Sequence, residues 1–107
     1  IGAVAGSGPA YVARFAAALA EGGAGLGLET GLARAVATQT LVGTAAMAAS
    51  GETMAQIARR VASPNGTTEQ GLAVLDAPDG LQSLVDAMLA AAIARGRQLA
   101  EEAAARH

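Results

Sequence analysis

The densest group of polar and backbone-shaping residues in the sequence is Ser-Pro-Asn-Gly-Thr-Thr at positions 63 to 68. Ser63 and Pro64 are expected to end one helix, because the residue before a proline is pushed out of the α region. Thr67 is expected to cap the next helix, with Gln70 three residues later completing a capping box. The loop would then join two helices and present the amides at the start of the second.

Such a loop permits two interpretations. The N-terminus of a helix has free N–H groups and a positive dipole end, which attract a carboxylate or a phosphate. The amides of residues 65 to 68, with three hydroxyls around them, would form such an anion site. Plain interhelical turns use the same residue types, however. The residues alone favour the turn and allow the site.

Other candidates for chemistry are weaker. The sequence has no cysteine and one histidine, the terminal His107, so we expect no disulfide, no thiol catalysis and no metal site. Its carboxylates show no metal-ligand spacing and are attributed to solvated helix faces. Arg59 and Arg60 are expected at a helix C-terminus, where positive charge complements the dipole. A role for one of them beside an acidic ligand stays open as the alternative.

Two groups of glycines superficially resemble a dinucleotide-binding loop: Gly2, Gly6 and Gly8, and then Gly22, Gly23, Gly25 and Gly27. That fingerprint requires a preceding strand, a helix that opens on the last glycine and an acidic residue about 20 positions later. None of this context is present. We therefore expect the glycines to end helices and to allow close helix packing, and we predict no cofactor-binding residue in this chain.

Composition limits the remaining function classes. The 107 residues suffice for one domain, and 52% are hydrophobic while only 2% are aromatic. A net charge of -2 gives no reason to expect nucleic acid or an anionic membrane surface. The longest uncharged interior run, residues 35 to 51, falls short of the roughly 20 apolar residues of a membrane span. Because Ile1 opens the chain without methionine, we expect it to be a piece of a longer protein.

The elements that must position these residues are helical, since apolar residues recur with the helical period and no stretch alternates like a strand. We predict an all-α domain of five helices. The first begins at Pro9, capped by Ser7 or Gly8, and runs to Gly22-Gly23. The others are expected from Thr30 to Ser50-Gly51, from Thr53 (boxed with Gln56) to Ala62, from Thr67 to Ala77-Pro78, and from Gly80 (after an Asp79 and Gln82 box) to about Arg106.

The last of these helices indicates a partner. A helix of about 27 residues is roughly 40 Å long, whereas a compact monomer of this size is only roughly 33 Å across. Its apolar face is also wider than packing on one neighbour requires. That face consists of Leu81, Leu84, Val85, Met88, Leu89, Ala92, Ile93 and Leu99. We therefore predict a homodimer with intertwined helices.

Three stretches of the sequence resemble one enzyme family. VASPNGTTEQGLAVLD, at 61 to 76, is similar to the S-P-G-G-T-T signature and its G-L-x-x-L-[DE] continuation in pyrroline-5-carboxylate reductases. AGSGPAYV at 5 to 12 resembles that family's S-G-S-G-P-A-Y, and ATQTLVGTA at 37 to 45 resembles its A-A-Q-T-x-x-G-A. The signature matches at Ser63, Pro64, Gly66, Thr67, Thr68, Gly71, Leu72, Leu75 and Asp76.

The resemblance implies that residues 1–107 are the C-terminal, all-helical dimerisation and substrate domain of a cytoplasmic enzyme of proline biosynthesis. Such an enzyme reduces 1-pyrroline-5-carboxylate to L-proline with NADPH or NADH, which an N-terminal Rossmann domain absent from this chain would bind. The isolated chain is then expected to be inactive. The resemblance further implies homodimers that often assemble into decamers. From the net charge we expect no nucleic-acid or membrane partner.

Carried onto this sequence, the resemblance assigns the substrate's carboxylate to Ser63, Asn65, Gly66, Thr67 and Thr68. It places the Thr68 hydroxyl near the ring nitrogen, where it would orient or protonate the imine. Three positions depart from the family pattern: Asn65 for glycine, Ala5 for serine and Leu81 for phenylalanine. Asparagine is the non-glycine residue best able to adopt a left-handed conformation, so the loop shape is expected to survive. The alternative hypothesis is a helical dimerisation module with no chemistry of its own.

Overall fold

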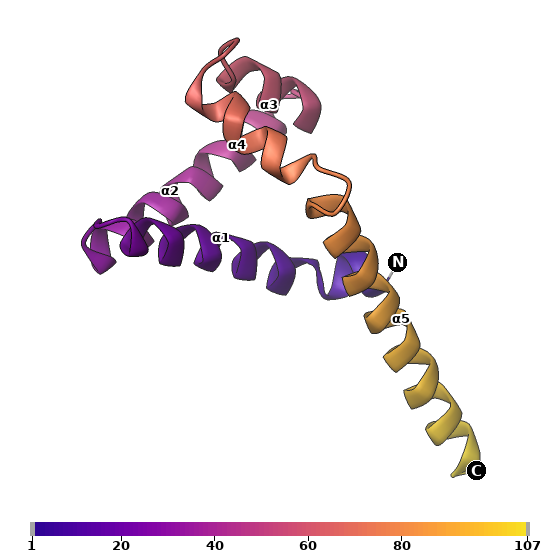
Figure 1. Cartoon of the computed structure of the whole chain (residues 1–107). Coiled ribbons are helices and arrows are strands. Elements are labelled where there is room, and N and C mark those ends of the chain that lie inside the picture. The colour runs from indigo at the N-terminus through magenta and orange to yellow at the C-terminus, as the bar shows by residue number, and fades with distance from the viewer. Residues whose placement is uncertain (1, 107) are drawn as a thin grey trace. The chain divides into compact units, whose positions relative to one another are not determined.

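The computed structural model describes residues 2 to 106, in which five α-helices follow a short π-helical turn. The order is η1 (Gly2–Gly6), α1 (Gly8–Gly25), α2 (Thr30–Ala49), α3 (Met54–Val61), α4 (Thr67–Leu75) and α5 (Leu81–Ala105) (Figure 1). None of the described residues forms a strand, which confirms the predicted all-α fold with five helices and a long last one. The chain divides into two compact units, Gly8–Ser63 and the remainder.

In the unit Gly8–Ser63, α1 and α2 form a hairpin that packs through small side chains. Its core is Ala20, Ala33 and Ala37, with Ala24 packed against them. Side chains pack closely against the backbone at Gly23, where an added Cβ would lie 3.2 Å from Leu28 Cδ1 and 3.6 Å from Ala33 Cβ. A core without aromatic rings is therefore filled by bringing two helices together over alanine and glycine.

The ends of these two helices differ in part from the prediction. Helix α1 continues through Gly22 and Gly23 to Gly25, and Gly27, at φ 111°, reverses the chain after it. Helix α2 is capped by Glu29 rather than Thr30: Glu29 Oε2 accepts the Leu32 N–H at 2.8 Å. The predicted stop at Ser50-Gly51 is confirmed, with Gly51 at φ 108°.

Helix α3 completes this unit. The predicted capping box between Thr53 and Gln56 is present. The Gln56 N–H donates to the Thr53 hydroxyl at 3.1 Å, and the Thr53 N–H donates to Gln56 Oε1 at 2.9 Å. Ile57, 6% exposed, is the one α3 residue buried in the described chain. At the C-terminal end Arg60 pairs with Glu52 at 2.7 Å. Helix α3 is thus fixed at both ends and along one face.

In the other unit, η1 contacts α5, and α4 leads into α5 through a short turn. An open groove of about 500 Å³ lies along η1 and α5, lined by residues that include Val4, Leu89, Ala92 and Ile93. The predicted box between Asp79 and Gln82 is wrong, because Gly80 caps α5 without a side-chain hydrogen bond. Gln82 instead donates to Asp86 Oδ1 at 2.9 Å.

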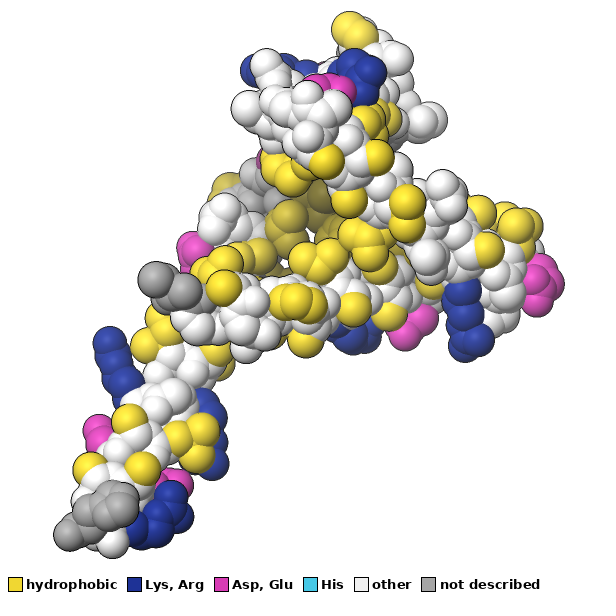
Figure 2. Space-filling model, turned by 180° about the vertical axis from the view of Figure 1, so that it is seen from behind, with side chains coloured by type: hydrophobic (Ala, Val, Ile, Leu, Met, Phe, Trp, Pro, Cys, Tyr) yellow, Lys and Arg dark blue, Asp and Glu magenta, His cyan; other side chains and the backbone are white. Residues whose placement is uncertain are grey.

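Helix α5 buries none of its residues within the described chain. Its 25 residues make it about 37 Å long, slightly shorter than predicted. Four members of the predicted apolar face are exposed, and Leu84 keeps 69% of its surface. Figure 2 shows hydrophobic side chains on the surface of both units. In the part of the chain that the structure describes, no helix is both long and apolar enough to cross a membrane.

Candidate functional site

The candidate loop begins where α3 stops. Helix α3 ends at Val61, and Ala62 turns to an extended conformation with ψ 115°, close to the predicted end. The proline at position 64 explains this end, since Ser63 cannot remain helical before it. The boundary between the two compact units falls inside the loop, after Ser63. Ser63 is exposed in its own unit.

Asn65 bends the loop in the way that its sequence position suggested. Its φ is 59°, and among the described residues no other non-glycine residue has a positive φ. In this left-handed region most side chains clash with the backbone, and asparagine tolerates it best after glycine. Asn65 therefore takes the backbone shape that glycine would supply at this place in the signature.

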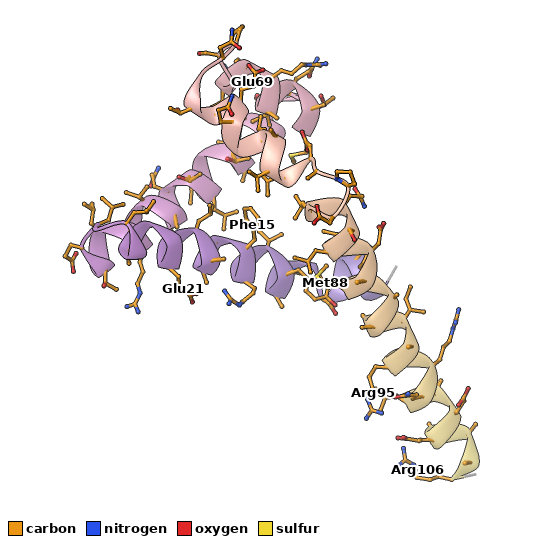
Figure 3. The ribbon with its side chains drawn as sticks, viewed as in Figure 1. Phe15, Glu21, Glu69, Met88, Arg95 and Arg106 are labelled. Carbon is orange, nitrogen blue, oxygen red and sulfur yellow. The ribbon has the colours of Figure 1, made fainter. Side chains whose placement is uncertain are left out.

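The loop also holds a carboxylate that the sequence analysis did not assign to it. Glu69 Oε2 accepts a hydrogen bond from the backbone N–H of Asn65 at 2.7 Å. Glu69, labelled in Figure 3, stands in the first turn of α4 and is the acidic residue of that turn. A negative charge there is favoured by the helix dipole. The side chain thereby ties the start of α4 back to the bend.

The predicted cap of α4 is wrong by one residue. Gly66, not Thr67, is the N-cap, and it has no side chain with which to cap the helix. Thr67 and Gln70 consequently form no capping box, and the Gln70 N–H bonds to the Gly66 carbonyl at 3.3 Å as ordinary helix backbone. The signal for Glu69 was present in the sequence, because a glutamate three residues after an N-cap commonly reaches back to the preceding backbone.

Thr67 and Thr68 are the first two residues of α4, and both are exposed. The N–H groups of a first helical turn have no acceptor within the helix, and Gly66 supplies none. Amides and hydroxyls of this turn are thus available to an acceptor from solution. A carboxylate or a phosphate is the kind of group that such a helix start can hold. Gly66, Thr67 and Thr68, which the sequence predicted as site residues, are consecutive here and follow the bend at Asn65.

The two arginines at the end of α3 lie where positive charge is expected, and Arg60 also has an ion-pair partner. Arg60 donates to Glu52 Oε1 at 2.7 Å, so its charge is already matched inside its own unit. Both arginines lie in the last turn of α3, as expected for helix-end charges. The interpretation as helix-end electrostatics is therefore the better supported one for Arg60.

The glycine groups do not fit a dinucleotide. Gly2 and Gly6 bound the π-helical turn, Gly22, Gly23 and Gly25 lie inside α1, and no described strand precedes either group. A phosphate-binding fingerprint needs that strand to aim the glycine turn. Among the described residues no cluster of three or more acidic, histidine or cysteine side chains is placed to hold a metal ion. His107 lies outside the described residues.

Comparisons with known proteins agree with the motifs. The family model "Pyrroline-5-carboxylate reductase dimerisation" matches residues 1–99. The chain is 44% identical over 101 residues to pyrroline-5-carboxylate reductase of Pseudomonas aeruginosa, covering 94% of this chain and 37% of that protein. It is 45% identical over 89 residues to that of Synechocystis, covering 82% and 33%, and 43% identical over 95 residues to pyrroline-5-carboxylate reductase 3 of Bos taurus, covering 88% and 30%. The chain thus spans about a third of the length of these relatives.

Proposed function

The chain belongs to the pyrroline-5-carboxylate reductase dimerisation family, and from this premise we propose that it is the dimerisation and substrate-binding part of an enzyme that reduces 1-pyrroline-5-carboxylate to L-proline. The observation that carries the proposal is the loop at 63 to 68. It keeps the family signature in sequence, and its one substituted position, Asn65, adopts the left-handed bend at φ 59° that glycine would supply. The bend opens directly onto the uncapped start of α4.

The substrate suits this arrangement. It carries one carboxylate and one ring C=N bond, and reduction requires that ring to be held in a fixed orientation. The amides at Gly66 and Thr67 and the hydroxyl of Thr67 would hold the carboxylate, and the part assigned to Ser63 stays a prediction from the resemblance. The Thr68 hydroxyl would then orient the ring nitrogen or supply its proton. The reductant, NADPH or NADH, would bind outside this chain, since its glycines do not fit a dinucleotide.

The family description also supports self-association. We propose a homodimer that buries the exposed apolar residues of α5, with assembly to a decamer as a further step. Intertwining of the two chains stays a prediction from the last helix and from the resemblance, and a cytoplasmic location stays a prediction from the resemblance. The absence of nucleic-acid and membrane partners stays a prediction from the net charge.

Thr68 is tested by kinetics on the complete reductase that contains this chain. Removing one hydrogen bond to a reacting group should lower kcat/KM for 1-pyrroline-5-carboxylate by about 10- to 100-fold in Thr68→Ala. Thr68→Ser keeps the hydroxyl and is the matched control, expected to retain most activity. Unchanged turnover by Thr68→Ala would remove Thr68 from this role, and a parent enzyme inactive on this substrate would overturn the proposed function.

A module without chemistry is the second candidate, favoured by the extensive exposed apolar surface of the described chain. Titration calorimetry of the chain with L-proline separates the two. Saturable heat that disappears in Thr68→Ala supports a substrate site within these residues. The module predicts no saturable heat, although the chain would still self-associate.

A further inference from the structure

The bend of the candidate loop is held by a side chain that the family signature does not include. Asn65 has the unfavourable positive φ of 59°, and its N–H is bonded to Glu69 Oε2 at 2.7 Å. The bond closes a small ring from the bend to the first turn of α4. Both residues are exposed, so no surrounding core holds the bend in place.

A comparison with α3 shows what is unusual about this tether. At the start of α3 the N-cap Thr53 and the third helical residue, Gln56, exchange hydrogen bonds in both directions. At the start of α4 the N-cap is Gly66, which contributes no side chain. Only the returning bond is present, and Glu69 directs it one residue further back, onto Asn65. Glu69 therefore fixes the residue that makes the bend and leaves the helix start uncapped.

We propose that Glu69 is a positioning residue for substrate binding: its carboxylate holds Asn65 in the left-handed conformation so that the free amides of the α4 start meet the substrate's carboxylate. The inference rests on the proposed function. Glu69 itself touches neither the substrate nor the reacting atoms. Because a non-glycine residue disfavours this conformation, the untethered loop would spend much of its time in shapes that bind the substrate less well.

The test uses steady-state kinetics of the complete reductase with 1-pyrroline-5-carboxylate. Loss of a charge-assisted hydrogen bond should raise KM by about tenfold in Glu69→Ala, while kcat changes less than about twofold. Glu69→Gln retains an oxygen that can accept the Asn65 N–H and should bring KM most of the way back. Glu101→Ala, an exposed carboxylate on α5, is the matched control and should leave KM unchanged.

Repeating the Glu69→Ala substitution in an Asn65→Gly enzyme separates the effect of the Asn65–Glu69 hydrogen bond from a general loss of structure. Asn65→Gly removes the conformational penalty of the bend. In that background Glu69→Ala should raise KM by less than about threefold, because glycine enters the left-handed region unaided. KM does not depend on the amount of folded enzyme, so partial unfolding would lower the apparent kcat and leave this comparison intact.

Three results would overturn the inference: an unchanged KM in Glu69→Ala, an equal rise in both backgrounds, or a KM below that of the parent in Glu69→Gln. The last result would identify Glu69 as a competitor of the substrate's carboxylate. Each of these requires a parent enzyme active on 1-pyrroline-5-carboxylate, whereas an inactive parent would refute the proposed function itself.

Discussion

Single carboxylates accept backbone N–H groups near the start of two described helices, Glu29 at α2 and Glu69 at α4. Glu29 Oε2 accepts the Leu32 N–H at 2.8 Å. Hydrogen bonds from the backbone N–H groups lower the pKa of Glu29 below its ordinary value, the one from Gly31 more than the one from Leu32. The folded state therefore favours the ionised carboxylate. Its stabilising contribution is present above the pKa of the unfolded chain and is lost as pH falls through the folded pKa.

Replacing Glu29 should reveal this linkage. Glu29→Ala removes the cap of α2 and is expected to lower Tm at about pH 7, with a deficit that becomes smaller toward about pH 3, as the pH falls through the lowered pKa of the Glu29 carboxyl in the unsubstituted chain. Glu21→Ala is the control, because Glu21 makes only a 3.9 Å ion pair with Arg14 and both side chains are exposed. Thermal melts followed by circular dichroism measure the difference. An equal deficit at both pH values would contradict the assignment.

At the same scale, the sequence predicted the bend but not its tether. The left-handed conformation of Asn65 followed from the residue type, because few non-glycine residues adopt it. Glu69 was passed over because Thr67 and Gln70 offered an equally good capping box one residue later. Whether Gly66 or Thr67 is the N-cap depends on the backbone conformation of the preceding loop. The spacing of residues in the sequence does not specify that conformation.

At the scale of elements, helix order and type were predictable and helix starts were less so. Apolar periodicity and the stops at Gly51 and Pro64 define where helices must be. At each start several residues compete for the N-cap. Thr53 is the N-cap of α3, where the Gln56 side chain completes a capping box. At α5 the N-cap is Gly80 and not the predicted Asp79. The structure supplies a steric reason for Gly80.

Gly80 occupies a place where no side chain fits. A Cβ there would lie 2.9 Å from the carbonyl oxygens of both Val74 and Ala77, and these backbone atoms cannot move as a flexible side chain would. Gly80→Ala should therefore destabilise the chain by about 1 to 3 kcal/mol through overpacking.

The control for Gly80 is Gly71→Ala in α4, where an added Cβ meets nothing within 4 Å. Gly71→Ala should leave stability unchanged or raise it by up to about 1 kcal/mol, from helix propensity. Urea unfolding of both variants, compared at equal protein concentration, measures the difference. Equal stability of the two variants would contradict the steric account of Gly80.

At the scale of the whole molecule, the chain exposes more surface than its mass requires. Its accessible surface is 7993 Å², whereas even two separate globules of half its mass would together expose only about 6,500 Å². The excess includes Val12, Phe15 and Leu19 on one side of α1 and Leu84 on α5. Figure 3 shows Phe15 and Glu21 on opposite sides of α1. The sequence predicted that a partner covers the apolar face of α5 and made no such prediction for α1, and a single chain does not specify how two copies pair.

Leu84 provides the test of that partner. It is 69% exposed in the single chain, so Leu84→Asp would change little if the chain acted alone. Burial of a leucine in a dimer stabilises by about 1.5 to 3 kcal/mol, and a symmetric dimer would contain two copies. Leu84→Asp should therefore raise the dimer dissociation constant by at least about 100-fold.

Ala90→Asp is the matched control, because nine residues at 100° each place position 90 opposite Leu81 and the apolar face. It introduces the same charge into the same helix and should leave the dissociation constant within about threefold of the parent, since an exposed position away from the interface contributes little. Sedimentation equilibrium measures both variants. An unsubstituted chain that stays monomeric at high micromolar concentration would refute the dimer. An equal rise of the dissociation constant in both variants would place the interface away from the apolar face of α5.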